Sequence, residues 1–382
     1  MRARVIAFYL PQYHPIPEND KFWGKGFTEW TNVAKAKPLF KGHYQPQIPA
    51  DLGFYDLRVP EVRIEQARLA KEAGIEGFCY WHYWFGNGKT VLDMPFHEVL
   101  TSGEPDYPFC LGWANHSWTT KTWEKGKSFT SETIIFEQQY PGKEDYANHF
   151  YAVLPAFKDH RYITVDGKPL FVIFDTDHFP KVSEFIAQWN QLAKENGLNG
   201  VFFVGRCDAL PIMTRKNAKH IDELTEPRYE KLIKQGFDGV NSVTLKYAEF
   251  KATGFVHKAI HSVMRKHFGG LFLDKYKYSD IINHFITPED YQPYVFPQLI
   301  PRRDRSPRSG RAAMIYYGST PELFARAAEN AVKCVENRDY EHRLVFLNAW
   351  NEWGEGAYME PDLKYGHGYI DALRITLEKY TR

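Results

Sequence analysis

The sequence predicts a single-domain (β/α)8 barrel with long loops after its strands, spanning residues 1–382. Two observations favour this α/β fold class. Eight short runs of the chain are almost continuously apolar, as expected for parallel strands that are buried on both faces. Amphipathic stretches lie between most of these runs, and such alternation is typical of an α/β barrel. A doubly wound sheet is the alternative, but "YLPQYHP" after the first run is not the glycine-rich phosphate turn usual in such sheets.

The apolar runs give the predicted strands directly. They occupy residues 5–10, 77–84, 108–115, 169–175, 200–206, 239–243, 295–300 and 343–350. Helical periodicity is clear within 320–338, where Leu323 and Phe324 begin an apolar stripe. Thr320 and Pro321 provide an N-cap and a first-turn proline for this helix. Further helices are predicted at 57–73, 182–196 and 369–381, and insertions at about 11–56 and 244–294.

Composition narrows the class of partner and the location. Lys and Arg total 48 and Asp and Glu total 47, a balance that indicates neither a nucleic-acid partner nor a strongly charged membrane surface. No window approaches a membrane span, and the first apolar stretch is too short for a signal peptide. Buried free thiols are expected at Cys79, Cys110, Cys207 and Cys334, because no C-x-x-C pair is present. A cytoplasmic location is expected, with a periplasmic or exported one if a leader was trimmed.

Aromatic residues cluster with polar ones at the ends of the predicted strands. Trp, Tyr and Phe make up 16% of the chain. In a (β/α)8 barrel the active site forms at the carboxyl ends of the strands. Flat apolar rings beside hydrogen-bonding groups suit the faces and edges of sugars, so we predict a saccharide site there. The predicted substrate-binding residues at the first three strand ends are Tyr9, Gln12, Tyr13, His14, Trp81, His82, Trp84, Trp113, Asn115, His116 and Trp118.

The stretch "WNEWGEG" at 350–356 follows the eighth predicted strand and holds two glutamates. If the chain turns helically there, Glu352 and Glu355 share a face, with Cβ atoms about 5–6 Å apart. Retaining glycosidases hold their carboxyl groups about 5–5.5 Å apart, whereas inverting enzymes need about 6.5–9.5 Å. Close carboxylates also split their pKa values, so that one serves as acid and the other as base. We therefore predict a catalytic pair, the alternative being a solvated acidic turn.

Other polar clusters point to different chemistry. Asp175 and Asp177 form a D-x-D pattern that could hold a divalent cation and a diphosphate, although a strand-end turn explains it equally well. No histidine has tight metal-ligand spacing, and neither a metal nor a cofactor is expected. One short loop is crowded with arginines, which either clamp an anionic group of a ligand or are solvated. These residues are Arg302, Arg303, Arg305, Arg308 and Arg311.

Four separated stretches carry a family resemblance over nearly the whole chain. They read "AFYLPQYHPIPENDKFWGKGFTEWTNV", "GIEGFCYWHYWF", "PFCLGWANHSWT" and "LNAWNEWGEGAYMEPD". In this order they strongly resemble the WbsX-type proteins of polysaccharide gene clusters, which are described as similar to glycoside hydrolase family 99. The resemblance implies a (β/α)8 barrel and a retaining mechanism without a metal. It also implies substrate contacts by Trp30, Asn351, Trp353 and Glu360.

The resemblance divides the roles of the two glutamates. It implies that Glu352 deprotonates the 2-hydroxyl of the sugar, which attacks C1 to give a 1,2-anhydro sugar. Glu355 would act first as acid and then as base. Two loops depart from the family pattern. His116 stands where relatives often have glutamate, with Lys121 nearby, and the loop "RRDRSPR" keeps Asp304, Pro307 and Arg308 but loses a Trp and an Asn.

These departures leave the mannose specificity of family 99 in doubt for this chain. Both lie where substrate should bind, and the additional arginines favour an anionic or otherwise different glycan. We predict a retaining glycoside hydrolase that acts on a poly- or oligosaccharide. The alternatives are a glycosyltransferase of O-antigen or other surface-polysaccharide assembly, for which Asp175 and Asp177 are a hint, and a barrel that binds glycans without turnover.

Overall fold

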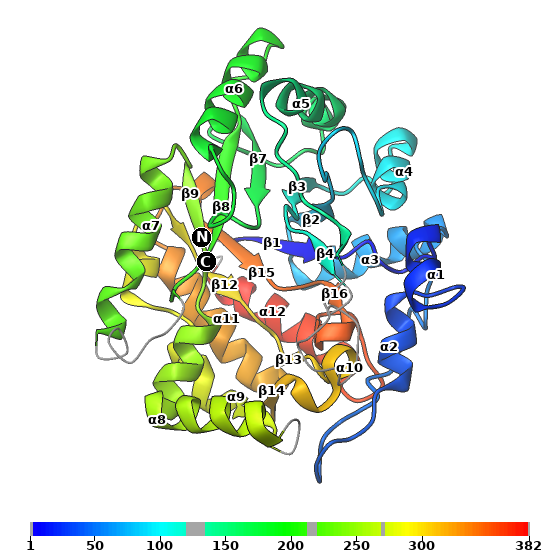
Figure 1. Cartoon of the computed structure of the whole chain (residues 1–382), viewed down its shortest axis with the longest axis vertical. Helices are drawn as coiled ribbons and strands as arrows, with labels where there is room; N and C mark the ends of the chain where they lie inside the picture. The colour runs from blue at the N-terminus through cyan, green and yellow to red at the C-terminus, as the bar shows by residue number, and fades with distance from the viewer. Residues whose placement is uncertain (1–2, 120–133, 212–219, 269–271, 381–382) are drawn as a thin grey trace.

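The computed structural model describes residues 3–119, 134–211, 220–268 and 272–380. Parallel strands form a barrel with helices packed around it, which confirms the predicted fold class (Figure 1). The barrel strands are β1 (Arg4–Tyr9), β2 (Gly77–His82), β3 (Phe109–Trp113), β7 (Lys168–Ile173), β8 (Phe202–Asp208), β9 (Gly239–Val243), β11 (Val295–Phe296), β12 (Gln298–Leu299) and β15 (Leu344–Leu347). Each lies within or beside a predicted apolar run.

The seventh strand of the barrel is divided in two by Pro297, which has no N–H to donate to a neighbouring strand. Its first half, β11, pairs with β9 through Val295 and Val240. Its second half, β12, pairs with β15 through Leu299 and Leu347. Because β1 pairs with both β15 and β2, the parallel sheet returns on itself. This closure excludes the doubly wound alternative.

Twelve α-helices are found within the described ranges. They are α1 (Pro17–Trp23), α2 (Glu29–Lys35), α3 (Pro60–Ala73), α4 (Met94–Ser102), α5 (Lys143–Phe157), α6 (Val182–Glu195), α7 (Thr225–Lys234), α8 (Leu245–Phe268), α9 (Tyr278–Ile281), α10 (Ser306–Ser309), α11 (Pro321–Val335) and α12 (Gly368–Lys379). Thr320 accepts a hydrogen bond from the Leu323 N–H, so the predicted N-cap of α11 is confirmed. Helix α3 ends at Gly74, whose left-handed backbone suits glycine.

The core lies inside the barrel and between the barrel and its helices. Trp189 of α6 is completely buried, and its ring centroid lies 4.9 Å from that of Phe171 on β7. Phe185, four residues earlier on the same helix, lies 4.6 Å from Trp189. The helical stripe predicted for this segment therefore faces the sheet. All four cysteines are buried and unpaired, as predicted.

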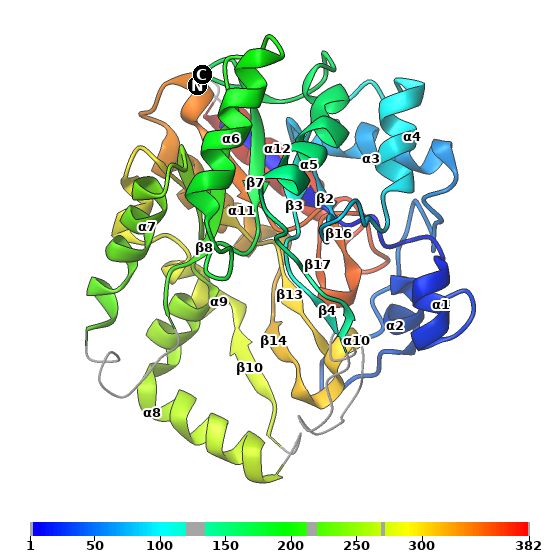
Figure 2. The same ribbon diagram turned by 45° about the horizontal axis from the view of Figure 1, so that its top comes forward.

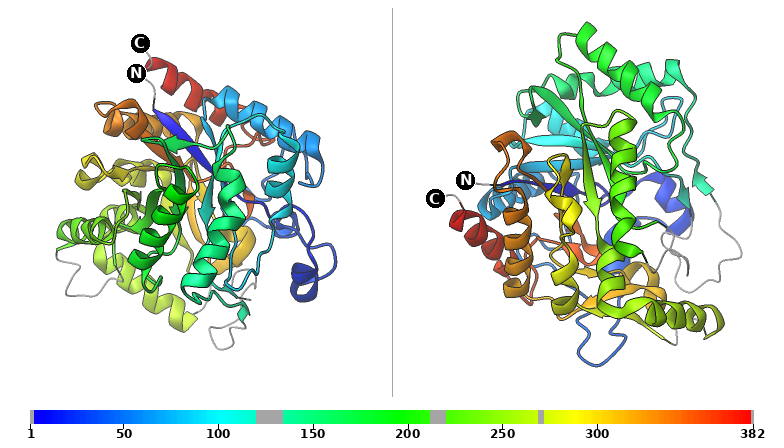
Figure 3. Two further views of the ribbon diagram at one scale, coloured as in Figure 1. Left: turned by 90° about the horizontal axis from the view of Figure 1, so that it is seen from above. Right: turned by 90° about the vertical axis from the view of Figure 1, so that its left-hand side faces the viewer.

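Both predicted insertions contain regular structure. Helices α1 and α2 lie within 11–56, while α8, α9 and β10 (Asp274–Lys277) lie within 244–294. Strand β10 belongs to a small sheet with β14 (Met314–Tyr317) and β13 (Arg303–Asp304), set beyond the barrel strands in Figure 2. The remaining short strands are β4 (Trp118–Thr119), β5 (Ile134–Phe136), β6 (Thr164–Val165), β16 (Asn351–Glu352) and β17 (Ala357–Tyr358). The start of β1 and the end of α12 lie side by side (Figure 3).

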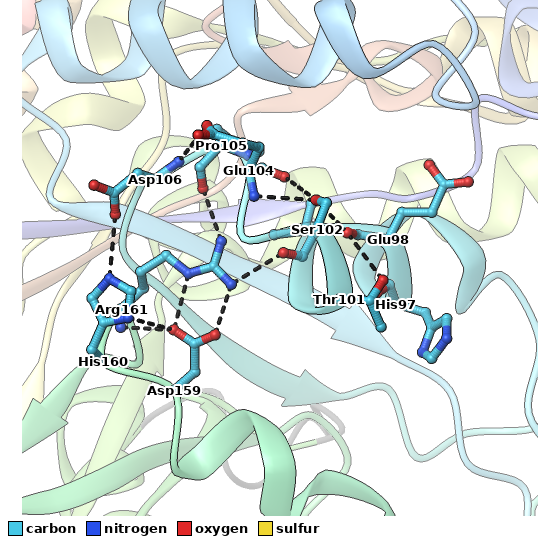
Figure 4. Close-up of polar contacts among 11 residues, drawn as sticks. His97, Glu98, Thr101, Ser102, Glu104, Pro105, Asp106, Asp159, His160 and Arg161 are labelled. Carbon is cyan, nitrogen blue, oxygen red and sulfur yellow. Dashed lines mark hydrogen bonds and ion pairs between the residues drawn. The ribbon is translucent and has the colours of Figure 1, made fainter.

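The amino-terminal end of the barrel is held by a buried arginine. Arg161 donates through Nη1 to the carbonyl oxygen of Pro105 at 3.1 Å and through Nη2 to that of Val99 at 3.1 Å. Its Nη2 also pairs with the Asp159 carboxylate at 2.7 Å (Figure 4). The guanidinium thereby ties the loop before β3 to the segment before β7, and its polar contacts are all within the protein.

Candidate active site

A cavity of about 470 Å³ lies at the carboxyl ends of the barrel strands. This volume falls within the range of about 300–1,000 Å³ usual for ligand sites. Residues at the ends of β1, β2, β3, β7, β8 and β15 line it, together with the loop between β12 and β14. The lining residues are Leu10, Gln12, Trp81, Tyr83, Ala114, His116, Trp118, Thr119, Phe174, Arg206, Arg303, Arg305, Arg308, Asn348, Glu352 and Glu355.

The two predicted catalytic glutamates project from a tight turn after β15. Glu352 ends β16, and the 3-10 helix η9 (Trp353–Glu355) follows directly, so a helical turn does separate the glutamates. Gly356 has a φ of 58°, in the left-handed region that favours glycine, and β17 then pairs back on β16. Both glutamates line the cavity. The turn thus presents two carboxylates at one edge of the site.

The loop after β1 fixes this turn from below. The Asn351 side chain accepts from the Leu10 N–H at 2.8 Å and donates to the Leu10 carbonyl at 3.0 Å. The Tyr13 hydroxyl donates to the Asn351 carbonyl and accepts from the Trp353 N–H. Backbone groups that the sharp turn leaves unpaired are thereby satisfied inside the protein. Asn351 and Tyr13 act on the position of Glu352 and do not line the cavity.

Glu360 anchors the same turn instead of facing the cavity. Its carboxylate accepts from Trp353 Nε1 at 2.5 Å, from the Tyr55 hydroxyl at 3.0 Å and from Gln66 Nε2 at 2.6 Å. Burial raises the pKa of Glu360 to about 7, against the lowering effect of these donors. Glu360 therefore supports the strand-eight turn and does not line the cavity, and a ligand contact by Glu360 stays a prediction.

Three arginines hold Glu355 in place. Its carboxylate lies 2.6 Å from Arg308 Nη1, 2.8 Å from Arg303 Nη2 and 3.1 Å from Arg305 Nη2. Arg308 is oriented from behind by Glu29 of α2, whose two oxygens accept from its Nε at 3.1 Å and its Nη2 at 2.9 Å. A guanidinium held in this two-pronged way has a defined direction. Glu352 is more distant, with its Oε1 3.9 Å from Arg308 Nη2.

The environment separates the pKa values of the two glutamates. Burial and the neighbouring charge of Glu355 raise the pKa of Glu352 to about 7, against the opposing effect of Arg308. Burial also acts to raise the pKa of Glu355, but Arg305, Arg303 and Arg308 together hold it well below its ordinary value. Glu355 is thus a fixed carboxylate in this state, whereas Glu352 can gain or lose a proton near neutral pH.

Aromatic rings form part of the cavity wall. Trp81 stacks on Phe8 with ring centroids 4.6 Å apart, and Trp118 meets Tyr83 edge to face at 5.1 Å. His116 lies 4.9 Å from the ring of Phe174. Burial lowers the pKa of His116, which favours the neutral form of its imidazole.

Seven of the predicted site residues come together in the cavity. They are Gln12, Trp81, His116, Trp118, Arg308, Glu352 and Glu355. Gln12 Nε2 and His116 Nδ1 are buried and have no hydrogen-bond partner among the described residues. Buried polar atoms in native structures are almost always paired, so these two atoms are suited to a bound polar ligand.

Several predicted residues point away from the cavity because side chains alternate along a strand. Trp81 faces the cavity, whereas the next residue, His82, faces outward and lies 2.8 Å from His149 of α5 between their Nε2 atoms. Trp84 and Trp113 also pack on His149, each with a ring centroid separation of 4.7 Å. These three residues pack between the barrel and α5 in this structure, and direct sugar contact by them stays a prediction.

Other residues predicted to contact the substrate also do not line the cavity. The Tyr9 hydroxyl donates to Gln66 of α3, and Trp30 Nε1 donates to the Tyr55 carbonyl beneath the strand-eight turn. Trp353 stacks on Tyr358 at 3.6 Å and is completely buried. Asn115 bonds with the Asp175 backbone and the Tyr140 hydroxyl, tying β3 to β7. His14 is buried and does not line the cavity.

Asp304 lies beside the cavity and not in it. Its Oδ2 lies 2.7 Å from His43 Nε2 and accepts from Gln45 Nε2 at 2.6 Å. It lines a second, smaller cavity of about 120 Å³, which shares Arg303 with the first. Two arginines of the same loop do not line the larger cavity. Arg302 is buried against Asp362 at 2.5 Å, and Arg311 is exposed.

The D-x-D pattern does not converge on one point. The Asp175 carboxylate contacts His178, whereas Asp177 forms an ion pair of 2.7 Å with Arg228. Across the described ranges, no three His, Cys, Asp or Glu side chains meet as a metal site requires. Lys121 lies outside the described residues. Every helix of the described ranges is too short or too polar to cross a membrane.

The cavity also contains residues that the sequence analysis did not place there. The sequence places Arg206 at the end of the fifth predicted strand without a role in the site. It places Arg303 and Arg305 in a loop that either clamps an anionic group or is solvated. Phe174 and Asn348 stand at the ends of their apolar runs, where the strand-end argument could have found them. Behind the cavity, Glu29 contacts Arg308. No local sequence pattern predicts this contact, because it depends on how the first loop folds over the barrel.

The fold and the cavity define a class: an α/β barrel with two glutamates among aromatic and arginine side chains at its active end. The family model described as "Glycosyltransferase WbsX" matches residues 5–373. The chain therefore belongs to the WbsX family. It is 34% and 33% identical over 382 residues to "Uncharacterized protein WxcX" from two strains of Xanthomonas campestris pv. campestris. The matches cover 99% of this chain but 50% of each relative, so the chain spans half the length of these proteins.

Solved structures share the fold at low sequence identity. Two structures of the GH99 endo-alpha-mannosidase from Bacteroides thetaiotaomicron are 13% and 14% identical to the chain, with TM-scores of 0.55 and 0.53. Each match covers 99% of this chain and 97% of the mannosidase. A "Glycoside hydrolase-like protein" is 14% identical, with a TM-score of 0.55 over 100% of this chain and 94% of its own. At this level of identity the matches show a shared fold and do not extend to function.

Proposed function

We propose that the protein is a carbohydrate-active enzyme that cleaves a glycosidic bond in a poly- or oligosaccharide, with Glu352 and Glu355 as the reacting carboxylates. The observation that carries this proposal is the placement of two glutamates in one cavity, with Glu355 paired to three arginines and Glu352 more distant from them. Their pKa values are accordingly shifted in opposite directions. Glycoside hydrolysis needs such a pair, one group that exchanges a proton and another that remains charged. The aromatic side chains of the same cavity suit the apolar face of a sugar ring.

In the proposed reaction Glu352 is the base. It takes the proton of the 2-hydroxyl, whose oxygen attacks C1 as the bond from C1 to the leaving oxygen breaks. A 1,2-anhydro sugar forms, and water later opens it with net retention at C1. A pKa of about 7 supports this role, because a base of that pKa is substantially ionised at neutral pH and still accepts a proton readily.

Glu355 has the more demanding role. As acid, it must deliver a proton to the leaving oxygen, yet Arg303, Arg305 and Arg308 all stabilise its charged form. Proton donation by Glu355 therefore requires that the bound substrate loosen some of these contacts or bring further negative charge to the site.

A glycosyltransferase is the second candidate, favoured by the description of the family model. Such an enzyme would hold a nucleotide diphosphate, and the arginines of the cavity could receive its phosphates. The separate partners of Asp175 and Asp177 count against a shared metal at that position. Binding of nucleotide sugars in the cavity, with a metal requirement, would favour this candidate over hydrolysis.

The test is a screen of bacterial and algal polysaccharides, with new reducing ends as readout and NMR of the first product to establish the anomer. We expect cleavage with retention by the wild type, and a loss of about 10²–10⁴-fold in rate for Glu352→Gln. Glu61→Gln, at an exposed position of α3, is the matched control and should keep full activity. Full activity of Glu352→Gln would contradict the assignment.

A further inference from the structure

Arg206 is the one arginine of the described cavity lining that does not pair with Glu355. It lies near the end of β8, the fifth strand of the barrel, and lines the cavity. Its guanidinium carbon lies 4.8 Å from the ring centroid of Phe174 and 5.9 Å from that of Phe8. Two aromatic faces therefore fix the position of the positive charge at the wall of the site.

The charge of Arg206 has no counter-ion of its own. Among the described residues no carboxylate lies within 4.0 Å of its guanidinium, and its buried Nε has no hydrogen-bond partner. Asp208, two residues later, pairs with Lys246 instead. Burial lowers the pKa of Arg206, although a guanidinium stays protonated at any physiological pH. By contrast, Arg303, Arg305 and Arg308 each pair with Glu355.

Arg206 is half-buried overall, but its Nε is enclosed and has no acceptor among the described residues, and such an unpaired polar group disfavours folding. Positions that lower stability in this way are usually kept for function. The cavity as a whole is biased in the same direction, because its described lining has four arginines but two glutamates. The arrangement is therefore suited to a ligand that supplies negative charge next to Arg206.

We propose that Arg206 recognises an anionic substituent on the bound glycan, such as the carboxylate of a uronic acid, a sulfate or a phosphate. The three groups share the oxygen geometry that a guanidinium binds through two parallel hydrogen bonds. This inference rests on the proposed function only in taking the ligand to be a glycan. The ring of Phe174 beneath the guanidinium and His116 beside it would contact the same sugar unit.

A bound anion also has a consequence for Glu355. Negative charge placed near Arg206 and Arg303 competes with Glu355 for the guanidiniums and favours the protonated form of that glutamate. Arg206 itself helps to keep Glu355 charged in the ligand-free state. A charged substrate would thus promote the proton uptake that the proposed acid role of Glu355 requires.

The experiment measures binding to an array of bacterial and algal polysaccharides, each present in its native form and in a neutral form. Carboxylates are reduced to hydroxymethyl groups, sulfates are removed by solvolysis, and phosphates by hydrofluoric acid. We expect wild-type protein to bind at least one native anionic glycan about 10–100-fold more tightly than its neutral form. The chemical treatment that abolishes binding identifies the anion.

Three variants assign the preference to one side chain. Arg206→Met should lose the preference for the native form, Arg206→Lys should keep part of it, and Arg68→Met, at an exposed position of α3, should behave as wild type. Arg206→Met should also unfold at the same or a higher temperature than wild type, because it removes a half-buried charge and an enclosed Nε that has no acceptor among the described residues. A purely structural arginine would give the opposite shift.

The inference is overturned if neutral forms bind as tightly as native ones, if no anionic glycan binds, or if Arg206→Met keeps the preference. It is also overturned if Arg206→Met unfolds at a lower temperature and loses all glycan binding. Reducing-end release on the same glycans separates the two proposals. Cleavage of neutral glycans alone would leave the proposed function standing without this inference. Binding that depends on Arg206 but is not followed by cleavage would support this inference and contradict the proposed hydrolysis.

Discussion

Two arginines at opposite ends of the barrel differ in how their charge is satisfied. Arg161, before β7, donates to two backbone carbonyls and pairs with Asp159 (Figure 4). Arg206, at the end of β8, lies over aromatic rings with no carboxylate beside it in the described part of the chain. The pKa of Arg161 is raised, chiefly by its hydrogen bond to Asp159, whereas burial lowers the pKa of Arg206.

The difference follows the division of labour between the two ends of an α/β barrel. The amino-terminal end serves stability, and groups there are satisfied by the protein itself. The carboxyl-terminal end forms the site, and some groups there are left for a ligand. Glu352 fits the same contrast, because burial makes its charged form costly at neutral pH. The predictions below probe this contrast from the largest expected effect to the smallest.

The largest effect is expected on catalysis from the carboxyl-terminal end. Glu352→Gln removes the proposed base without changing side-chain size, and we expect the loss of rate already given, about 3–5 kcal/mol in the barrier. Reducing-end release under saturating glycan is the measurement, with circular dichroism as a check of folding. A variant that is inactive because it is unfolded would weaken the contrast between the two ends.

The next effect is expected on stability from the amino-terminal end. Arg161→Met leaves the Asp159 carboxylate and two carbonyl groups without their donor, and breaking a buried pair of this kind costs about 3 kcal/mol. Urea unfolding measures the change, and the glycan preference of the folded fraction should be unaltered. Equal stability losses for Arg161→Met and Arg206→Met would break the comparison.

The pH dependence of the free energy of unfolding should reveal the raised pKa of Glu352. Its pKa in the folded protein is about 7, above that of an exposed glutamate, so the folded state holds a proton that the unfolded state has already released. The free energy of unfolding should therefore fall on the order of 2 kcal/mol as pH rises from about 4.5 to 7. Glu352→Gln should show a smaller fall than wild type, because Glu360, whose pKa burial also raises to about 7, still contributes to it. Denaturant titrations across pH can measure the difference.

Deprotonation of Glu352 should raise activity while it lowers the free energy of unfolding. As a base, Glu352 works in its deprotonated form, so kcat/KM should rise as pH increases through about 7. A rate that falls over this range would indicate instead that Glu352 donates the proton, and would exchange the proposed roles of the two glutamates.

The smallest effect is expected from a solvated arginine. Arg68 forms ion pairs with Glu65 and Glu72 on α3, but its side chain is 55% exposed. Exposed pairs contribute little, so Arg68→Met should change the free energy of unfolding by less than about 0.5 kcal/mol. A larger change would mean that Arg68→Met is unsuitable as a control for the two buried arginines.

The sequence predicted the barrel well because strand position depends on local composition. Each apolar run became a strand, and even Pro297 divided the seventh strand without preventing closure. The meeting of Glu352 and Glu355 in the cavity was also predictable, since they follow the last run at a spacing that one helical turn brings together.

The walls of the site were less predictable. A run that is apolar throughout does not reveal which alternate side chains face inward, so Trp81 and His82 were given the same role although they point in opposite directions. Contacts between distant segments were also hidden. The pairing of Glu29 with Arg308 joins positions separated by most of the chain, and no local pattern indicates it.

Gly354 limits how the strand-eight turn of this chain can vary. A Cβ at this position would lie 1.5 Å from Glu29 Oε1, so the carboxylate of α2 occupies the space that a side chain would need. Glu29 in turn holds Arg308, and Arg308 holds Glu355. The first insertion and the strand-eight turn are therefore not interchangeable parts. A chimaera that took either segment from a relative would have to inherit positions 29, 308 and 354 together.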